Sequence, residues 1–112
     1  MKLTHIAASL AVAALAGFST QTMAAVDADA AQALFKKNKC NTCHDADKVK
    51  KGPSLKSIAA KYKGKADGQA TLVKAMTTGP KVKTADGEEE HKVLDSKDAA
   101  AHKNLADWIL AQ

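Results

Sequence analysis

The sequence predicts a small all-α domain of about four helices. Apolar residues recur at intervals of three and four in four separate segments, the spacing that places them on one face of a helix. Aspartate, serine or Gly-Pro at the segment boundaries is typical of helix ends, and no stretch alternates convincingly between apolar and polar residues as a strand would. The length leaves room for one domain of this kind.

The N-terminus has the pattern of a secretory signal peptide, residues 1–24. Lys2 precedes an apolar run over residues 6–18, and small residues occupy the −3 and −1 positions of a cleavage site after Ala24. The apolar run is well short of the roughly 20 residues that span a membrane, and an uncleaved anchor is the alternative. We therefore expect a mature domain of residues 25–112 in the bacterial periplasm, with no membrane span.

The first two helices flank a lysine-rich loop. The first is predicted to begin at Asp27 or Asp29, to carry Phe35 on its apolar face and to end at Lys39 in a basic turn. The second has apolar residues at helical spacing over residues 55–62 and follows a Gly-Pro pair. This organisation places a loop of mixed charge between two amphipathic helices.

The last two helices are predicted in the C-terminal half. Asp67 caps the third, whose apolar stripe includes Met76 and which a second Gly-Pro pair ends. The last helix opens at Asp95 or Ser96, and its apolar stripe includes Trp108. We expect the first and last helices to pack against each other through this tryptophan and the phenylalanine of the first helix.

Both cysteines lie in the motif C-x-x-C-H, formed by Cys40, Cys43 and His44. Two thiols separated by two residues add to the two vinyl groups of a haem, and the adjacent histidine ligates the iron. A disulfide or a thioredoxin-like redox pair leaves the histidine unexplained, and a helix rather than a strand precedes the motif. A structural zinc site would need a second Cys or His pair. The motif therefore predicts one covalently attached haem c.

The composition suits a domain that encloses a large cofactor. Beyond the signal peptide the chain keeps one Phe, one Tyr, one Trp and one Met, so a haem would supply volume that the side chains do not. The chain contains no arginine, and nucleic-acid-binding proteins usually rely on arginine and stacking aromatics, so we expect no nucleic acid partner. A field of lysines favours redox partners with acidic docking faces.

The mature chain resembles a class I c-type cytochrome, the small bacterial monohaem kind, over nearly all of residues 27–111. The resemblance rests on a helix entering CNTCH, a loop closing at KGPSL, a YKGK stretch and a final helix ending LADWILAQ. It implies a small cytochrome c-like domain wrapped around one covalently attached haem, with Pro53 beside the proximal ligand His44. A nearby backbone carbonyl would then accept a hydrogen bond from the free ring nitrogen of that histidine.

The chain departs from the family pattern at the second axial ligand of the iron. The family supplies a methionine just before the last helix, and this chain has none over residues 79–95, where His91 is the only good iron donor. We therefore predict His91 as the distal ligand. Met76 on the third helix and an open or otherwise ligated iron are the alternatives. His102 is expected at the surface or edge of the last helix, and residues 88–90 as a solvated acidic turn. The alternative is that these glutamates lie near the haem, where negative charge would stabilise ferric iron and lower the potential.

The predicted function is transfer of single electrons between redox partners, without bond chemistry. We expect a monomer that acts alone or as a subunit of a larger redox enzyme. Ligation of the iron by two histidines predicts a lower reduction potential than ligation by histidine and methionine. The alternative is a haem-based ligand-binding or redox-switch protein in which His91 detaches on reduction and admits a small diatomic molecule. No convincing acid/base constellation favours a peroxidase.

Overall fold

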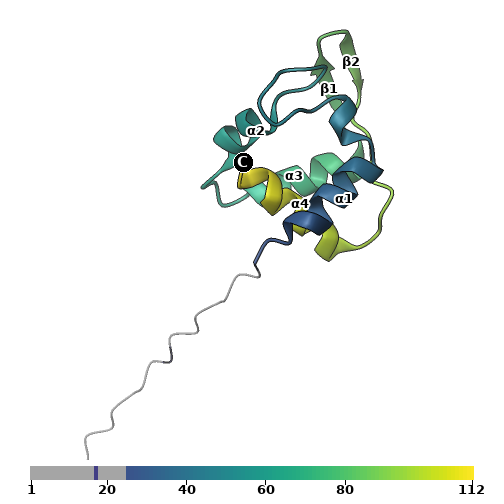
Figure 1. The fold of residues 1–112 in the computed structure, drawn as a ribbon. Coiled ribbons are helices and arrows are strands. Elements are labelled where there is room, and N and C mark those ends of the chain that lie inside the picture. The colour runs from purple at the N-terminus through teal and green to yellow at the C-terminus, as the bar shows by residue number, and fades with distance from the viewer. Residues whose placement is uncertain (1–16, 18–24) are drawn as a thin grey trace, which may run out of the picture.

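The computed structural model describes Gly17 and residues 25–112, so the predicted signal peptide lies, apart from Gly17, outside the described residues. The described part is mainly helical (Figure 1), which confirms the prediction of a small domain of about four helices. The helices are α1 (Ala28–Lys37), α2 (Leu55–Tyr62), α3 (Gly68–Thr78) and α4 (Ala99–Leu110). None of the helices in this part of the chain has the length and apolar character needed to cross a membrane.

Polar side chains start α1 and α2. The carboxylate of Asp27 accepts a hydrogen bond from the backbone N–H of Ala30 at 3.0 Å, so the first of the two predicted caps begins α1. The hydroxyl of Ser54 accepts from the N–H of Ser57 at 3.2 Å at the start of α2. Both bonds satisfy backbone donors that have no partner within the helix.

The start of α4 differs from the prediction. The helix begins after Asp98, whose carboxylate accepts from the N–H groups of Ala100 and Ala101, and not after Asp95 or Ser96. The backbone N–H of Asp95 is instead bound by the side chain of Asn38, and the chain bends here before the helix begins. A distant contact therefore decides which of several capping-type residues begins the helix.

The core lies where α4 packs against the other three helices. Leu105 and Ala106 on α4 are fully buried. The rings of Phe35 and Trp108 lie with their centroids 5.6 Å apart and their planes tilted by 60°, which confirms the predicted packing of the first helix against the last. The remaining buried apolar residues of the core are Ala31, Leu55, Ala59, Leu72, Met76, Leu94 and Ile109.

An antiparallel hairpin, β1 (Lys81–Thr84) and β2 (Gly87–Glu90), follows α3. The expectation that the domain lacks strands was therefore wrong. Residues 88–90 form a strand and not the expected turn, although Glu88 and Glu90 are exposed as expected. The strands are short and mostly charged, so they lack the β-branched and aromatic enrichment that signals a strand. Their register pairs Lys83 with Glu88 and Lys81 with Glu90, and such opposite charges stabilise a strand pair.

Candidate cofactor site

A cavity of about 460 Å³ lies between the helices, the hairpin and the motif loop, by which we mean residues 40–53. In Figure 1 the hairpin and the motif loop lie on the opposite side of the domain from α4. The volume falls in the range of pockets that hold cofactors. Side chains of all four helices, the motif loop and the hairpin line it, including Phe35, Cys40, Cys43, His44, Ile58, Leu72, Met76, Val82, His91, Leu105 and Ile109.

The three residues of the C-x-x-C-H motif all line this cavity. Lys39 turns the chain out of α1 with a φ of 56°, a left-handed value that is unusual for a residue other than glycine. A short 3₁₀ turn, Cys40–Thr42, follows, and the carbonyl of Cys40 accepts from the N–H groups of both Cys43 and His44. This tight turn presents both thiols and the imidazole to one space.

The two thiols are free in the structure. Burial raises the pKa of the Cys40 thiol, and the ammonium group of Lys92 opposes that shift only in part. A thioredoxin-like redox pair needs the opposite, a thiol whose pKa is lowered so that the thiolate attacks at neutral pH. The environment of Cys40 thus argues against the redox-pair alternative.

The imidazole of His44 is oriented by the motif loop. Its Nδ1 lies 2.7 Å from the carbonyl oxygen of Pro53, and because a carbonyl can only accept, Nδ1 carries the hydrogen. The other ring nitrogen, Nε2, is then left with a lone pair for a metal ion. Burial lowers the pKa of His44, which the bond to Pro53 opposes and the nearby His91 reinforces, so the ring is neutral at pH 7.

Gly52 leaves room for the His44 ring because it has no side chain, a role that the sequence alone did not reveal. A Cβ at this position would lie 2.8 Å from Cε1 and 3.2 Å from Nδ1 of His44. The N–H of Gly52 also donates to the carbonyl of Cys43 at 2.9 Å. The Gly-Pro pair is therefore more than a turn before α2, because its glycine allows the ring to reach the carbonyl of Pro53.

His91 lies across the cavity from the motif, directly after β2. The ring centroids of His44 and His91 are 6.2 Å apart, and the ring planes are inclined by 41°. Nδ1 of His91 lies 2.9 Å from the carbonyl oxygen of Lys92, so it too carries the hydrogen and leaves Nε2 with a lone pair. The structure thus brings two imidazoles with the same tautomer to one space.

The His91 segment, residues 91–98, is attached to the domain by backbone groups. The N–H of His91 donates to the carbonyl of Pro80 at 2.8 Å, and that of Leu94 donates to the carbonyl of Met76 at 2.9 Å. Asn38, which is 1% exposed, accepts from the N–H of Asp95 at 2.7 Å and donates to a carbonyl of α1. No pattern in the sequence singled out Asn38, because the partner that gives it this role, Asp95, lies 57 residues further along the chain.

Met76 and His102, the other candidate ligands, occupy different surroundings. Met76 is 7% exposed and belongs to the apolar core, although its side chain also borders the cavity. His102 was expected at the surface or edge but is buried, with Nε2 bonded to the carbonyl oxygen of Ser96 at 2.8 Å. It does not line the cavity. This bond to the segment just before α4 allows the polar ring to be buried there.

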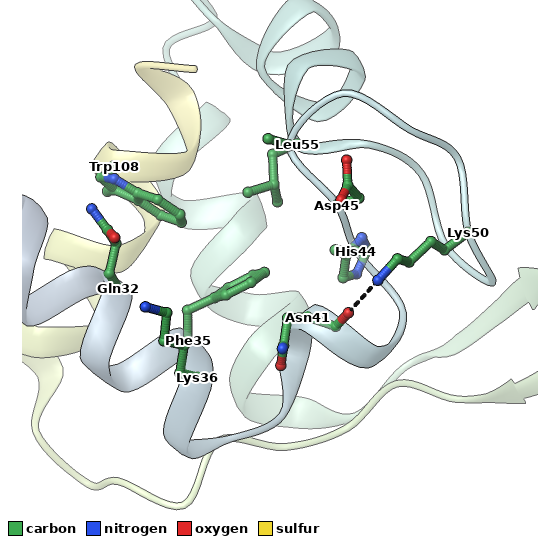
Figure 2. Close-up of a pocket in the computed structure, with 10 residues that line it drawn as sticks. Gln32, Phe35, Lys36, Asn41, His44, Asp45, Lys50, Leu55 and Trp108 are labelled. Atoms are coloured by element: carbon green, nitrogen blue, oxygen red, sulfur yellow. Dashed lines mark hydrogen bonds between the residues drawn. The ribbon is translucent and has the colours of Figure 1, made fainter.

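A smaller cavity of about 290 Å³ borders His44 from another direction. Figure 2 shows Phe35 and Trp108 on one side of it and His44 and Lys50 on the other, where the ammonium group of Lys50 donates to the carbonyl of Asn41 at 2.9 Å. The aromatic pair between α1 and α4 thus reaches the neighbourhood of the His44 ring.

The donor set suits a haem attached through thioethers. Two thiols spaced for vinyl groups, an oriented neutral imidazole and a mainly apolar cavity meet in one place, and these are the groups that a covalently attached haem requires. When bound, the haem iron supplies one-electron redox chemistry. This site in a small helical domain defines a c-type cytochrome.

Comparisons with known proteins agree with this class. The family model "Cytochrome c" matches residues 28–111. Cytochrome c-551 of Pseudomonas denitrificans is 34% identical over 77 residues, which cover 69% of this chain and 90% of that protein. Cytochrome c-552 of Nitrosomonas europaea is 37% identical over 98 residues, covering 78% and 79% of the two chains.

A solved structure is also similar, that of the class 1 cytochrome MtoD from Sideroxydans lithotrophicus ES-1. It has a TM-score of 0.74 and 53% sequence identity, and the match covers 78% of this chain and 97% of that one. The chain described here belongs to the cytochrome c family. It is a small class I c-type cytochrome, an electron-transfer protein that binds one haem c covalently.

Proposed function

We propose that this cytochrome is a periplasmic electron carrier whose haem is bound by Cys40 and Cys43 and whose iron is ligated by His44 and His91. The observation that carries the proposal is the 6.2 Å separation of the two imidazole centroids. A bond from imidazole nitrogen to a first-row metal is roughly 2 Å long. Because each ring centre lies about 1 Å beyond its nitrogen, two imidazoles on one iron need centroids roughly 6 Å apart.

The orientation of the rings supports the same ligand pair. Each Nδ1 donates to a backbone carbonyl, that of Pro53 for His44 and that of Lys92 for His91. Such a bond fixes the tautomer of a ligating histidine and makes its other nitrogen a stronger donor. Two strong donors stabilise ferric iron, so the reduction potential should lie below that of a cytochrome with a histidine and a methionine ligand.

The anchoring of the His91 segment favours a carrier over a redox switch. The backbone N–H groups of His91, Leu94 and Asp95 each donate a hydrogen bond to a different residue of the rest of the domain. The side chain of Leu94 is also buried in the core. A ligand that detaches on reduction would need a segment with few such contacts. Carbon monoxide added to the reduced protein tests this. A carrier gives no spectral change, whereas rapid binding would establish the switch.

The ligand pair is tested by the optical and electron paramagnetic resonance spectra of the ferric protein. The wild type should give a low-spin signal without a sulfur-to-iron charge-transfer band. His91→Ala should become high-spin, and the matched Met76→Leu variant should keep the wild-type signal because leucine preserves the core volume. A charge-transfer band lost in Met76→Leu would show methionine ligation and refute the histidine pair.

The docking face is proposed at the lysines around the motif loop. Lys36, Lys37, Lys39, Lys48 and Lys50 are exposed, and Val49 in their midst is 78% exposed, which gives a basic surface with an apolar centre. Such a surface attracts acidic partner faces, and the attraction weakens as salt screens the charges.

Small oxidants test the local charge of this surface. Oxidation of the reduced protein by anionic ferricyanide should slow as salt rises, whereas oxidation by a cationic cobalt complex should not. Lys48→Gln and Lys50→Gln should reduce the salt effect, and Lys103→Gln on α4 should not. Equal behaviour of the three variants would place the docking face elsewhere.

Export also belongs to the proposal. A signal peptide at residues 1–24 would leave residues 25–112 as a monomeric domain in the periplasm, where haem is attached. The mass of the purified holoprotein tests this, because it should correspond to residues 25–112 plus one haem. A mass that retains residues 1–24 would indicate an uncleaved anchor.

A further inference from the structure

Lys51 joins the two segments that carry the two imidazoles. Its ammonium group lies 2.7 Å from Oε2 of Glu89 and 3.9 Å from Oδ2 of Asp86, both on the hairpin. Its backbone carbonyl also accepts from the N–H of Ala85 at 3.4 Å, in the hairpin turn. Within residues 25–112, every hydrogen bond and ion pair between the motif loop and the hairpin involves Lys51.

The alternation of β2 explains why Glu89 is the partner of Lys51. Successive side chains of a strand point to opposite faces, so Glu89 lies on the face opposite to that of Glu88 and Glu90. In the hairpin register Glu89 pairs with Val82, and both residues line the cavity and are partly buried. Glu88 and Glu90 are exposed and lie opposite lysines of β1. Glu90 also borders the cavity, but of these three glutamates only Glu89 forms an ion pair with the motif loop in the described structure.

The hairpin needs an attachment of this kind. An isolated two-stranded hairpin is marginally stable in water, and the described strands pair only with each other. His91 follows β2 directly in the chain. Its N–H also donates to the carbonyl of Pro80, the residue just before β1, so both strands are tied to His91. Movement of the hairpin relative to the motif loop would therefore change the distance between His44 and His91.

We propose that Lys51 is a positioning residue for the distal ligand. By binding Glu89 and Asp86 it holds the hairpin against the motif loop and so keeps the imidazole of His91 at ligand distance from that of His44. This inference rests on the proposed ligation of the iron by both histidines. It adds that the retention of His91 depends on an exposed ion pair, and is therefore sensitive to salt.

The expected effect is on ligand exchange rather than on global stability. The side chains of Lys51 and Glu89 are 35% and 40% exposed, and an exposed pair changes an equilibrium by roughly fivefold at most. Such a change hardly alters unfolding of the domain. The change is measurable in the rate at which an external ligand replaces His91, because that ligand binds only after the histidine has left the iron.

Cyanide binding to the ferric holoprotein is the test. Lys51→Gln and Glu89→Gln should each bind cyanide roughly two- to fivefold faster than the wild type at low salt, and the double variant no faster than either single variant. Rising salt should bring the wild type towards the rate of the variants, because the charges are screened. The melting temperature should remain nearly unchanged.

Lys83→Gln and Glu88→Gln are the matched controls. They make the same charge changes in a cross-strand pair that makes no ion pair with the motif loop, and should exchange like the wild type. If they accelerate cyanide binding as much as Lys51→Gln and Glu89→Gln, or if the latter two are inert, Lys51 is not a positioning residue. A ferric wild type without two imidazole ligands would instead refute the proposed function itself, so the two failures are distinguishable.

Discussion

A Cβ on Gly52 would lie 2.8 Å from Cε1 of His44, closer than a methyl group and a ring carbon approach without a shift. The two residues belong to the same loop, and the chain returns to His44 through the bond from the N–H of Gly52 to the carbonyl of Cys43. Glycine at this position therefore sets the orientation of the imidazole. The consequence for the iron is testable.

Gly52→Ala should displace the His44 ring and weaken its bond to the carbonyl of Pro53. We expect a smaller fraction of protein with attached haem and a changed ferric spectrum, both measured on the purified protein. Gly64→Ala is the control. Its Cβ would meet open space, but its φ of 76° is strained for alanine, so it should cost about 1 kcal/mol of stability and leave the spectrum intact. Identical spectra for the two variants would show that the close approach is tolerated.

Asn38→Ala should destabilise the domain and loosen the His91 segment. The substitution removes the side-chain acceptor of the Asp95 N–H and empties a site where Asn38 is 1% exposed, which costs about 1 to 3 kcal/mol. Asn104→Ala is a matched control, since Asn104 also makes two side-chain bonds, to the N–H and carbonyl of Asp27, but at the surface. Chemical denaturation should show the larger loss for Asn38→Ala, and cyanide exchange should accelerate in that variant alone. An equal loss would mean that burial of Asn38 is unimportant.

His102→Gln separates a structural histidine from a ligand. Glutamine retains a donor for the carbonyl of Ser96, so we expect a loss of about 1 kcal/mol from imperfect packing and no change in the ferric spectrum. His91→Gln should show the reverse and change the ferric spectrum, because the half-buried side chain of His91 lines the cavity. A spectral change in His102→Gln would require a different fold of α4 in the holoprotein.

Asp45 should contribute to the acid sensitivity of the motif loop. Hydrogen bonds from the N–H groups of Lys48 and Asp47 lower the pKa of its carboxyl below the usual 3.8. A group whose pKa is lower in the folded state stabilises the fold above its unfolded value, and this contribution is lost as pH falls from 3.8 through the folded pKa. Melting temperatures between about pH 2 and 5 should therefore fall less steeply in Asp45→Asn than in the wild type.

Asp67→Asn is the control for the change of charge, because Asp67 makes no capping hydrogen bond at the start of α3. This variant should keep the wild-type dependence of the melting temperature on pH. If Asp45→Asn and Asp67→Asn have the same profile, the two backbone bonds to Asp45 do not stabilise the ionised form.

The helices and the attachment motif could be predicted because their signals are local. Helical spacing, the cap at Asp27 and the aromatic residues Phe35 and Trp108 all agree with the structure. The hairpin, the start of α4 at Asp98 and the burial of His102 were predicted wrongly. The hairpin consists of charged residues that carry little strand signal, and the start of α4 follows a bond from Asp95 to the distant Asn38. The burial of His102 accompanies a bond to Ser96, outside the helix, which helical spacing does not reveal.

The sequence alone determined that the chain has the thiols, the adjacent histidine and the helical pattern of a covalent haem protein. It also showed that His91 is the donor available where a methionine is usual. The tertiary structure decided that the ring centroids of His44 and His91 lie 6.2 Å apart. It also decided that Gly52 leaves room for the His44 ring and that Lys51 forms an ion pair with Glu89. Spacing along the chain determines local geometry, but the distance between two loops depends on packing, hydrogen bonds and ion pairs that form only when the whole domain folds.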